Sequence, residues 1–189
     1  MGKSRALLFY TGIIVAFVFL LASQAAGQEI VPRNLIVDNE QGAVQLRFGL
    51  RVLNSEKLSR YLKQGTSLRL HCTAKMEVER SFWWDKELRR SATTFMLRYD
   101  SLDDEYLLIM GKDKSEKRDS DLLTLLHSGW AQIRMDLGPW PEEYKEDNLV
   151  LYLTVRMVRI DVPLWLKRTL FFWSWDVVPV KNYRIRLGS

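Results

Sequence analysis

The chain has 189 residues, of which 47% are hydrophobic and 27% are charged, a balance that indicates a folded domain and excludes a disordered chain. One cysteine and two histidines exclude a disulfide framework, a multi-cysteine metal cluster and a three-histidine site built from this chain alone. The formal net charge of +5 is mild and its cations are spread among acids, so we expect no nucleic-acid partner.

The N-terminus has the order of a secretory leader. Lys3 and Arg5 precede an uncharged apolar run over residues 6–22, and small residues follow it. This order is typical of a signal peptide, whereas a spanning helix needs about 20 apolar residues. Residues 1–27 are therefore either a cleaved signal peptide or a retained membrane anchor. Both interpretations make residues 28–189 a single exported domain, in the periplasm or on the periplasmic face of the inner membrane.

The exported part shows the period of two that marks half-buried strands. Apolar and polar side chains alternate along residues 44–52 and again along residues 68–78. This alternation favours antiparallel pairing, because the strands of parallel sheets are apolar on both faces. Between the two runs, Asn54 or Ser55 begins a predicted short helix that Gly65 ends.

The other predicted elements are short and have short connections. Residues 28–42 are expected to be a lead-in with a short edge strand at 35–37. Further strands are predicted at 95–99, 106–110, 131–137, 148–160 and 177–187, a charged loop at 111–119, and short helices between 119 and 129 and over 163–172. The pattern predicts a mainly β fold, an antiparallel sandwich-like sheet of about seven strands with two or three short helices.

No group of residues in the sequence points to a reaction. His71 and Cys72 are neighbours in the strand at 68–78, so their side chains leave opposite faces and cannot bind one metal ion. Cys72 falls in the apolar row and is expected in the core. The acidic runs at 103–105 and 142–147 lack the alternating acids and central glycine of a calcium loop. We expect no catalytic residues, no metal, no cofactor and no enzymatic activity.

Aromatic side chains gather at two places in the exported part. Adjacent bulky residues cannot all face inward along a strand, so some of them are covered by another element or exposed. Exposed, they would suit a membrane surface, where rings lie at headgroup depth and cations meet anionic lipid, or a protein partner. Buried, they would close the core. The candidate binding residues are Trp83, Trp84, Trp165, Leu166, Lys167, Arg168, Phe171, Phe172, Trp173 and Trp175.

Short motifs along the chain resemble a known family. After the leader they are Gly65, Trp83-Trp84-Asp85, Leu97-Arg98-Tyr99-Asp100, Pro163-Leu164-Trp165 and Trp175-Asp176-Val177-Val178-Pro179. In this order they resemble the bacterial domain-of-unknown-function family 4390. The resemblance implies a small exported envelope protein for which no catalytic residues are assigned. It also implies a partner in the inner membrane, such as a sensor kinase.

These observations predict a non-enzymatic envelope protein that acts as an accessory module. It would bind a membrane-protein partner or the membrane surface through its aromatic residues, with the N-terminal segment as a further membrane contact. The alternative is a periplasmic carrier or sensor of a hydrophobic small molecule, bound in a cleft between sheets. A third hypothesis, an undetected hydrolase, would need perturbed acids around a cleft.

Overall fold

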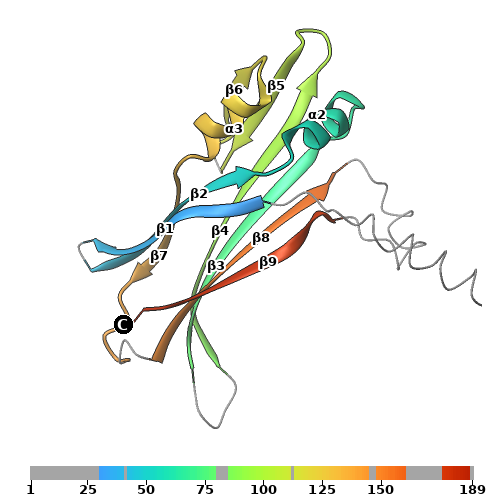
Figure 1. Cartoon of the computed structure of the whole chain (residues 1–189). Helices are drawn as coiled ribbons and strands as arrows, with labels where there is room; N and C mark the ends of the chain where they lie inside the picture. Colours follow the sequence, from blue (N-terminus) through green and yellow to red (C-terminus); the bar gives the residue numbers. More distant parts are fainter. Residues whose placement is uncertain are drawn as a thin grey trace, which may run out of the picture.

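Two antiparallel sheets and two short helices make up the part of the chain that the computed structural model describes, residues 30–40, 42–79, 85–111, 113–144, 148–160 and 176–187 (Figure 1). In chain order the elements are β1 (Ile30–Glu40), β2 (Ala43–Val52), α2 (Ser55–Lys63), β3 (Leu68–Val78), β4 (Lys86–Asp100), β5 (Glu105–Met110), β6 (Ser115–Asp119), α3 (Leu122–Trp130), β7 (Ile133–Pro139), β8 (Leu149–Arg159) and β9 (Asp176–Arg186).

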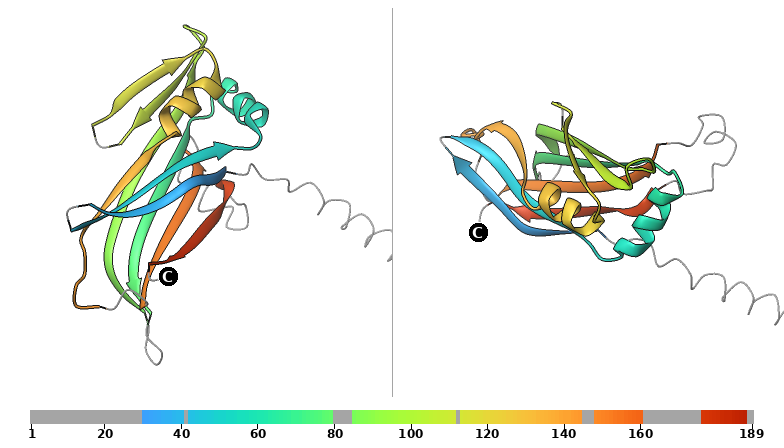
Figure 2. Two further views of the ribbon diagram at one scale, coloured as in Figure 1. Left: turned by 60° about the vertical axis from the view of Figure 1, so that its left-hand side comes forward. Right: turned by 90° about the horizontal axis from the view of Figure 1, so that it is seen from above.

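The strands form two layers. One sheet has the order β1-β2-β7 and the other has the order β6-β5-β4-β3-β8-β9, and neighbouring strands are antiparallel throughout. The layers pack face to face (Figure 2), and side chains such as Phe48 of β2 and Met76 of β3 are fully or almost fully buried in one core between them. The expected mainly antiparallel, sandwich-like β domain is confirmed.

The alternation in the sequence corresponds to burial in β3. Every second residue from Leu68 to Val78 is buried, and the residues between them are half-buried. Cys72 has no exposed surface, and His71 lies on the opposite face, as the spacing predicts. One face of the strand therefore builds the core while the other forms the outer surface of the six-stranded sheet.

The strand predictions are wrong for one edge strand of each sheet, β1 and β6. β1 is a full strand where only residues 35–37 are expected, because a bulge between Arg33 and Ile36 breaks the alternation. β6 occupies much of the predicted charged loop at 111–119. Its residues are exposed on both faces, with only Asp119 half-buried, so no burial pattern marks this edge strand in the sequence. The described residues therefore hold nine strands rather than about seven.

Both helices begin at side-chain caps. Asn54 accepts a hydrogen bond from the Lys57 amide at 3.1 Å, and Gly65 follows α2 with a φ of +82°, as predicted. α3 is capped by Asp121, whose carboxylate accepts from the Thr124 amide at 2.8 Å, and this bond lowers the pKa of that carboxyl. The sequence pattern predicts this cap at Asp119 or Ser120, one or two residues before its position in the structure.

The sequence predicts that this second helix ends near Gly129, and α3 ends one residue later, at Trp130. A Cβ at position 129 would come 2.1 Å from Cδ2 of the buried Leu108 on β5. The glycine therefore serves the close approach of α3 to β5 and not the end of the helix. The helix predicted at 163–172 lies outside the described residues.

A second glycine sets the contact between β2 and the end of α3. A Cβ on Gly49 would lie 2.7 Å from the carbonyl oxygen of Ala131, which directly follows α3. Gly49 and Ala131 meet through the backbone of packed elements, so neither can move away as a flexible side chain would.

Replacing Gly49 with Ala should destabilise the domain by about 1–3 kcal/mol, because the new methyl group forces the α3–β7 connection away from β2. The free energy of unfolding from chemical denaturation measures this change. The matched control is Ala92→Ser on an exposed position of β4, for which a change within about 0.5 kcal/mol is expected. Equal stability of Gly49→Ala and the wild type would contradict the close contact.

His71, on the outer face of the six-stranded sheet, makes the free energy of unfolding depend on pH. Its Nδ1 lies 3.2 Å from the hydroxyl of Thr94, and partial burial, followed by the charges of Arg69 and Arg156, lowers the pKa of the imidazole below 6.5. Above about pH 6.5 the ring is neutral in the folded and unfolded states alike. As the pH falls through that value, the unfolded chain binds the proton first, so the free energy of unfolding decreases.

The variant His71→Gln should lose less stability than the wild type between pH 7.5 and 5, because it has no imidazole to protonate. Denaturation curves at both pH values measure this difference. Arg69→Gln, which removes one of the two neighbouring charges, should show an intermediate loss. The same loss in all three proteins would show that His71 is not the titrating group.

Candidate functional site

None of the ten candidate binding residues from Trp83 to Trp175 lies within the described residues, so the aromatic site remains a prediction. The structure does describe where the segments that carry them join the domain. Ile30, the first described residue, pairs with Val52 at the end of β2. Arg159 at the end of β8 pairs with Leu68 at the start of β3, and Asp176 pairs with Val158.

These attachment points lie around one helix. α2 connects Val52 to Leu68, the guanidinium of Arg159 lies 4.5 Å from the ring of Tyr61 on α2, and the amide of Ile160 donates to Ser67 at 2.9 Å. We call this part of the molecule the α2 end (Figure 1). The chain before residue 30 and the chain between 160 and 176 therefore both join the domain at the α2 end, although they are far apart in sequence.

The α2 end also exposes apolar and cationic side chains. Five large hydrophobic side chains are exposed among the described residues, and three of them, Leu53, Leu102 and Leu123, lie here with 53%, 94% and 54% of their surface accessible. Arg60 and Lys63 are exposed on α2. Acids are present too, at the tip of the β4–β5 hairpin that carries Leu102. Exposed leucines beside cations are typical of surfaces that contact lipid.

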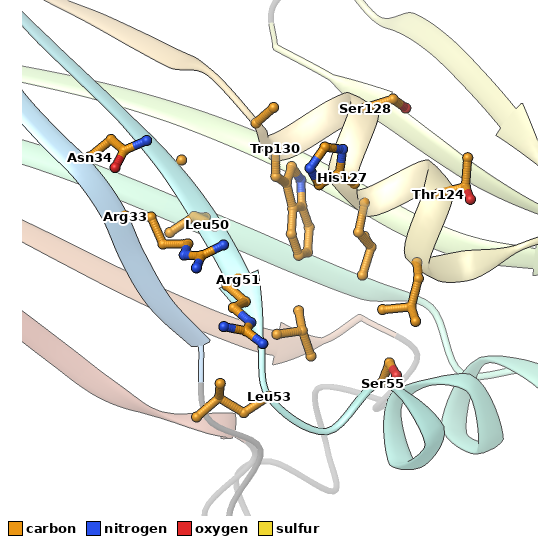
Figure 3. Close-up of a pocket in the computed structure, with 15 residues that line it drawn as sticks. Arg33, Asn34, Leu50, Arg51, Leu53, Ser55, Thr124, His127, Ser128 and Trp130 are labelled. Atoms are coloured by element: carbon orange, nitrogen blue, oxygen red, sulfur yellow. The ribbon is translucent and has the colours of Figure 1, made fainter.

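A pocket of about 930 Å³ opens on the same end, in the angle between β1–β2 and α3 (Figure 3). Its floor is buried and formed mainly by Gly49, Leu50, Leu126 and Trp130. Its exposed walls carry polar and apolar groups. They include Arg33, Asn34, Arg51, Leu53, Leu123, Thr124, His127 and Ser128.

Positive charge dominates the pocket. Arg33 lies opposite Gly49 and Arg51 is two residues further along β2, so the two arginines occupy diagonal positions on one sheet face, about 7–8 Å apart. His127 faces them from α3 (Figure 3). No aspartate or glutamate is among the described residues that line the pocket, and neither arginine forms an ion pair within the described part of the chain.

Trp130 links the pocket to the core. Its indole has no exposed surface and meets the ring of Phe95 edge-on at 6.4 Å between centroids. The indole Nε1 has no hydrogen-bond acceptor among the described residues. A buried donor left without an acceptor costs about 1–3 kcal/mol, and this N–H lies beside the pocket without being accessible to solvent.

Cys72 is not a reactive group in the folded domain. Burial raises the pKa of its thiol to about 12, so the thiolate that could attack or bind a metal is absent near neutral pH. No group of three or more metal-binding side chains occurs in the described part of the chain. None of the helices described there is long and apolar enough to cross a membrane.

In the native protein Cys72 should resist alkylation by iodoacetamide at pH 8 and react fully once the protein is denatured, because folding both buries the thiol and keeps it protonated. Mass spectrometry of the labelled chain measures both states. As a positive control, Ser101→Cys on the exposed β4–β5 turn should be labelled once per chain without denaturant. Fast labelling of the native wild type would contradict the burial of Cys72.

The described motifs that carry the family resemblance support the fold. Leu97 is in the core, Tyr99 donates a hydrogen bond to Asp104, and Asp100 accepts from the Leu102 amide at 3.0 Å. The bond to Asp104 is the main reason that the pKa of Tyr99 is raised to about 12. These contacts close the β4–β5 hairpin, and Gly65 ends α2. They do not converge on a site.

Fold and site together define an antiparallel β-sandwich with a cation-lined pocket at the end where its N-terminal segment enters. The chain belongs to the family described as "Domain of unknown function (DUF4390)", whose model matches residues 27–186. The expected family is thereby confirmed. No curated protein and no solved structure matches the chain.

The pocket was not predicted from the sequence. Arg33 lies in the stretch that the sequence predicts to be a lead-in, and no pattern in the sequence singles out His127 as a site residue. Arg33, Arg51 and His127 share no motif, and only the pairing of β1 with β2 and the path of α3 bring them together.

Proposed function

We propose that the protein is a non-enzymatic envelope module that works at the periplasmic face of the inner membrane, with its α2 end turned toward the bilayer. One observation carries this proposal. The chain that follows the apolar run at 6–22 and the aromatic segment between 160 and 176 both join the domain at the α2 end.

The length of the N-terminal connection supports this orientation. Residues 23–29 lie between the apolar run and β1, and seven extended residues span at most about 25 Å. With the run retained in the bilayer, the α2 end is held within this distance of the lipid surface. The exposed Leu53, Leu102 and Leu123 and the cations of α2 would then face the headgroups, where apolar side chains and cations are both favourable.

In this arrangement the aromatic residues of 161–175, with Lys167 and Arg168 among them, would contact the membrane surface or a membrane-protein partner such as a sensor kinase. Trp83 and Trp84 belong to a different connection, between β3 and β4. Because Val78 pairs with Lys86 and with Leu149, this connection leaves the sheet at the end opposite α2. The two aromatic groups therefore serve separate contacts in our proposal.

A carrier or sensor of a hydrophobic small molecule is the second candidate function. The observation that favours it is the pocket of about 930 Å³ beside Trp130. This pocket lies between β1–β2 and α3 and not between the two sheets, where the sequence suggested a cleft.

Two measurements test the membrane proposal. The first is an alkaline carbonate wash of native membranes, followed by determination of the size of the chain. With the run retained as an anchor, we expect the full-length chain to stay in the membrane fraction, because an uncleaved apolar segment embedded in the bilayer resists extraction. A shorter, soluble form would overturn the anchor and leave only surface contact to be tested.

The second measurement determines which end of the domain faces the bilayer. Leu102→Cys at the α2 end and Glu142→Cys at the opposite end are each labelled with an environment-sensitive dye, while the buried Cys72 stays unlabelled. In vesicles containing anionic lipid and a lipid-borne quencher, we expect strong quenching at residue 102 and little at residue 142. Equal quenching at both positions, or none at residue 102, would overturn the proposed orientation.

A further inference from the structure

The pocket holds positive charge that its own lining does not balance. Arg33 and Arg51 occupy diagonal positions about 7–8 Å apart on one face of β1–β2, and His127 lies across from them on α3. Like charges at this separation repel each other, and no described carboxylate lines the pocket to offset them. An anion between the two arginines would remove this repulsion.

Beside polar residues such as Asn34 and Thr124, the pocket lining contains four leucines and Trp130. Leu50, Leu126 and Trp130 are buried at its floor, while Leu53 after β2 and Leu123 on α3 are exposed. A bare inorganic anion would leave these groups unused. A ligand with an aliphatic chain would remove the two exposed leucines from water, which is favourable by about 25 cal/mol per Å² of apolar surface buried.

We infer that this pocket binds an amphiphile with a phosphate head, held between Arg33 and Arg51, and an aliphatic tail lying along Leu53 and Leu123. Phosphate fits better than carboxylate, because its three oxygens can serve two guanidinium forks at once. The inference rests on the second candidate function and names its ligand class. The phosphate can belong to a lipid of the bilayer or to a free amphiphile, since both present the same group.

Hexyl phosphate is the probe for this site, because its short chain keeps it monomeric in water. Calorimetric titration of the protein as isolated from the cell measures its affinity, with inorganic phosphate and hexanol as the two half-ligands. We expect hexyl phosphate to bind at least about tenfold more tightly than either one, since each contributes only part of the contact. Equal affinity for inorganic phosphate and hexyl phosphate would overturn the amphiphile assignment.

The double variant Arg33→Gln/Arg51→Gln should weaken the binding of hexyl phosphate by about tenfold or more, because charge-assisted hydrogen bonds are lost. The matched control is Arg134→Gln, an exposed arginine on β7 that does not line the pocket. It should bind like the wild type. Unchanged affinity in the double variant, or an equal loss in the control, would overturn the site.

A second readout does not depend on these variants. In ¹H–¹⁵N spectra, the indole N–H resonance of Trp130, assigned with Trp130→Phe, should shift on addition of hexyl phosphate and not on addition of hexanol alone. The indole resonances of the other tryptophans control for general effects. A bound probe that leaves the Trp130 resonance unmoved would place the ligand elsewhere.

Competition between hexyl phosphate and lipid nanodiscs identifies the source of the phosphate group. Nanodiscs containing phosphatidic acid, a lipid with the same phosphomonoester group, that weaken hexyl phosphate binding where phosphatidylcholine nanodiscs do not would identify a bilayer lipid, whereas no competition from either would identify a free amphiphile. Both results support the site. Failure of hexyl phosphate to bind a protein that resists carbonate extraction would overturn this inference and leave the membrane proposal standing.

Discussion

The pairing of β3 on both sides is the constraint on which the rest of the molecule depends. All eleven residues from Leu68 to Val78 pair with β8, and all but the bulged end pair regularly with β4. Because the side chains alternate between faces, a slip of one residue would turn the buried row outward and the cations of the outer row into the core. The register is therefore strongly specified, and it determines which helix and strand ends lie beside Leu68.

The α2 end is a consequence of this register. α2 reaches Leu68 from β2, β8 ends beside Leu68 at Arg159, and β2 itself pairs with the first residues of β1. Three connections that are remote in sequence are thereby gathered without a dedicated motif. The side chains exposed there can vary without loss of the fold, because the core behind them is set by other residues.

The sequence is most informative where one face of a strand is buried. β2, β3 and β8 follow from alternation alone, and α2 follows from Asn54 and Gly65, because burial and capping are local demands that leave a local pattern. The edge strands β1 and β6 could not be predicted in the same way, since one carries a bulge and the other is exposed on both faces. The pocket could not be predicted at all, because its arginines and α3 are brought together only by long-range pairing.

The position of Cys72 has a consequence for the order of events during folding. The thiol lies at the centre of the six-stranded sheet, between Thr93 of β4 and Val155 of β8. It cannot be enclosed until β8, one of the last strands of the chain, has docked. In an oxidising compartment the unfolded chain therefore presents one reactive sulfur until folding is nearly complete. A mixed disulfide formed at this residue before that point would keep β8 from closing over the core, because the fully buried position has no room for a second group.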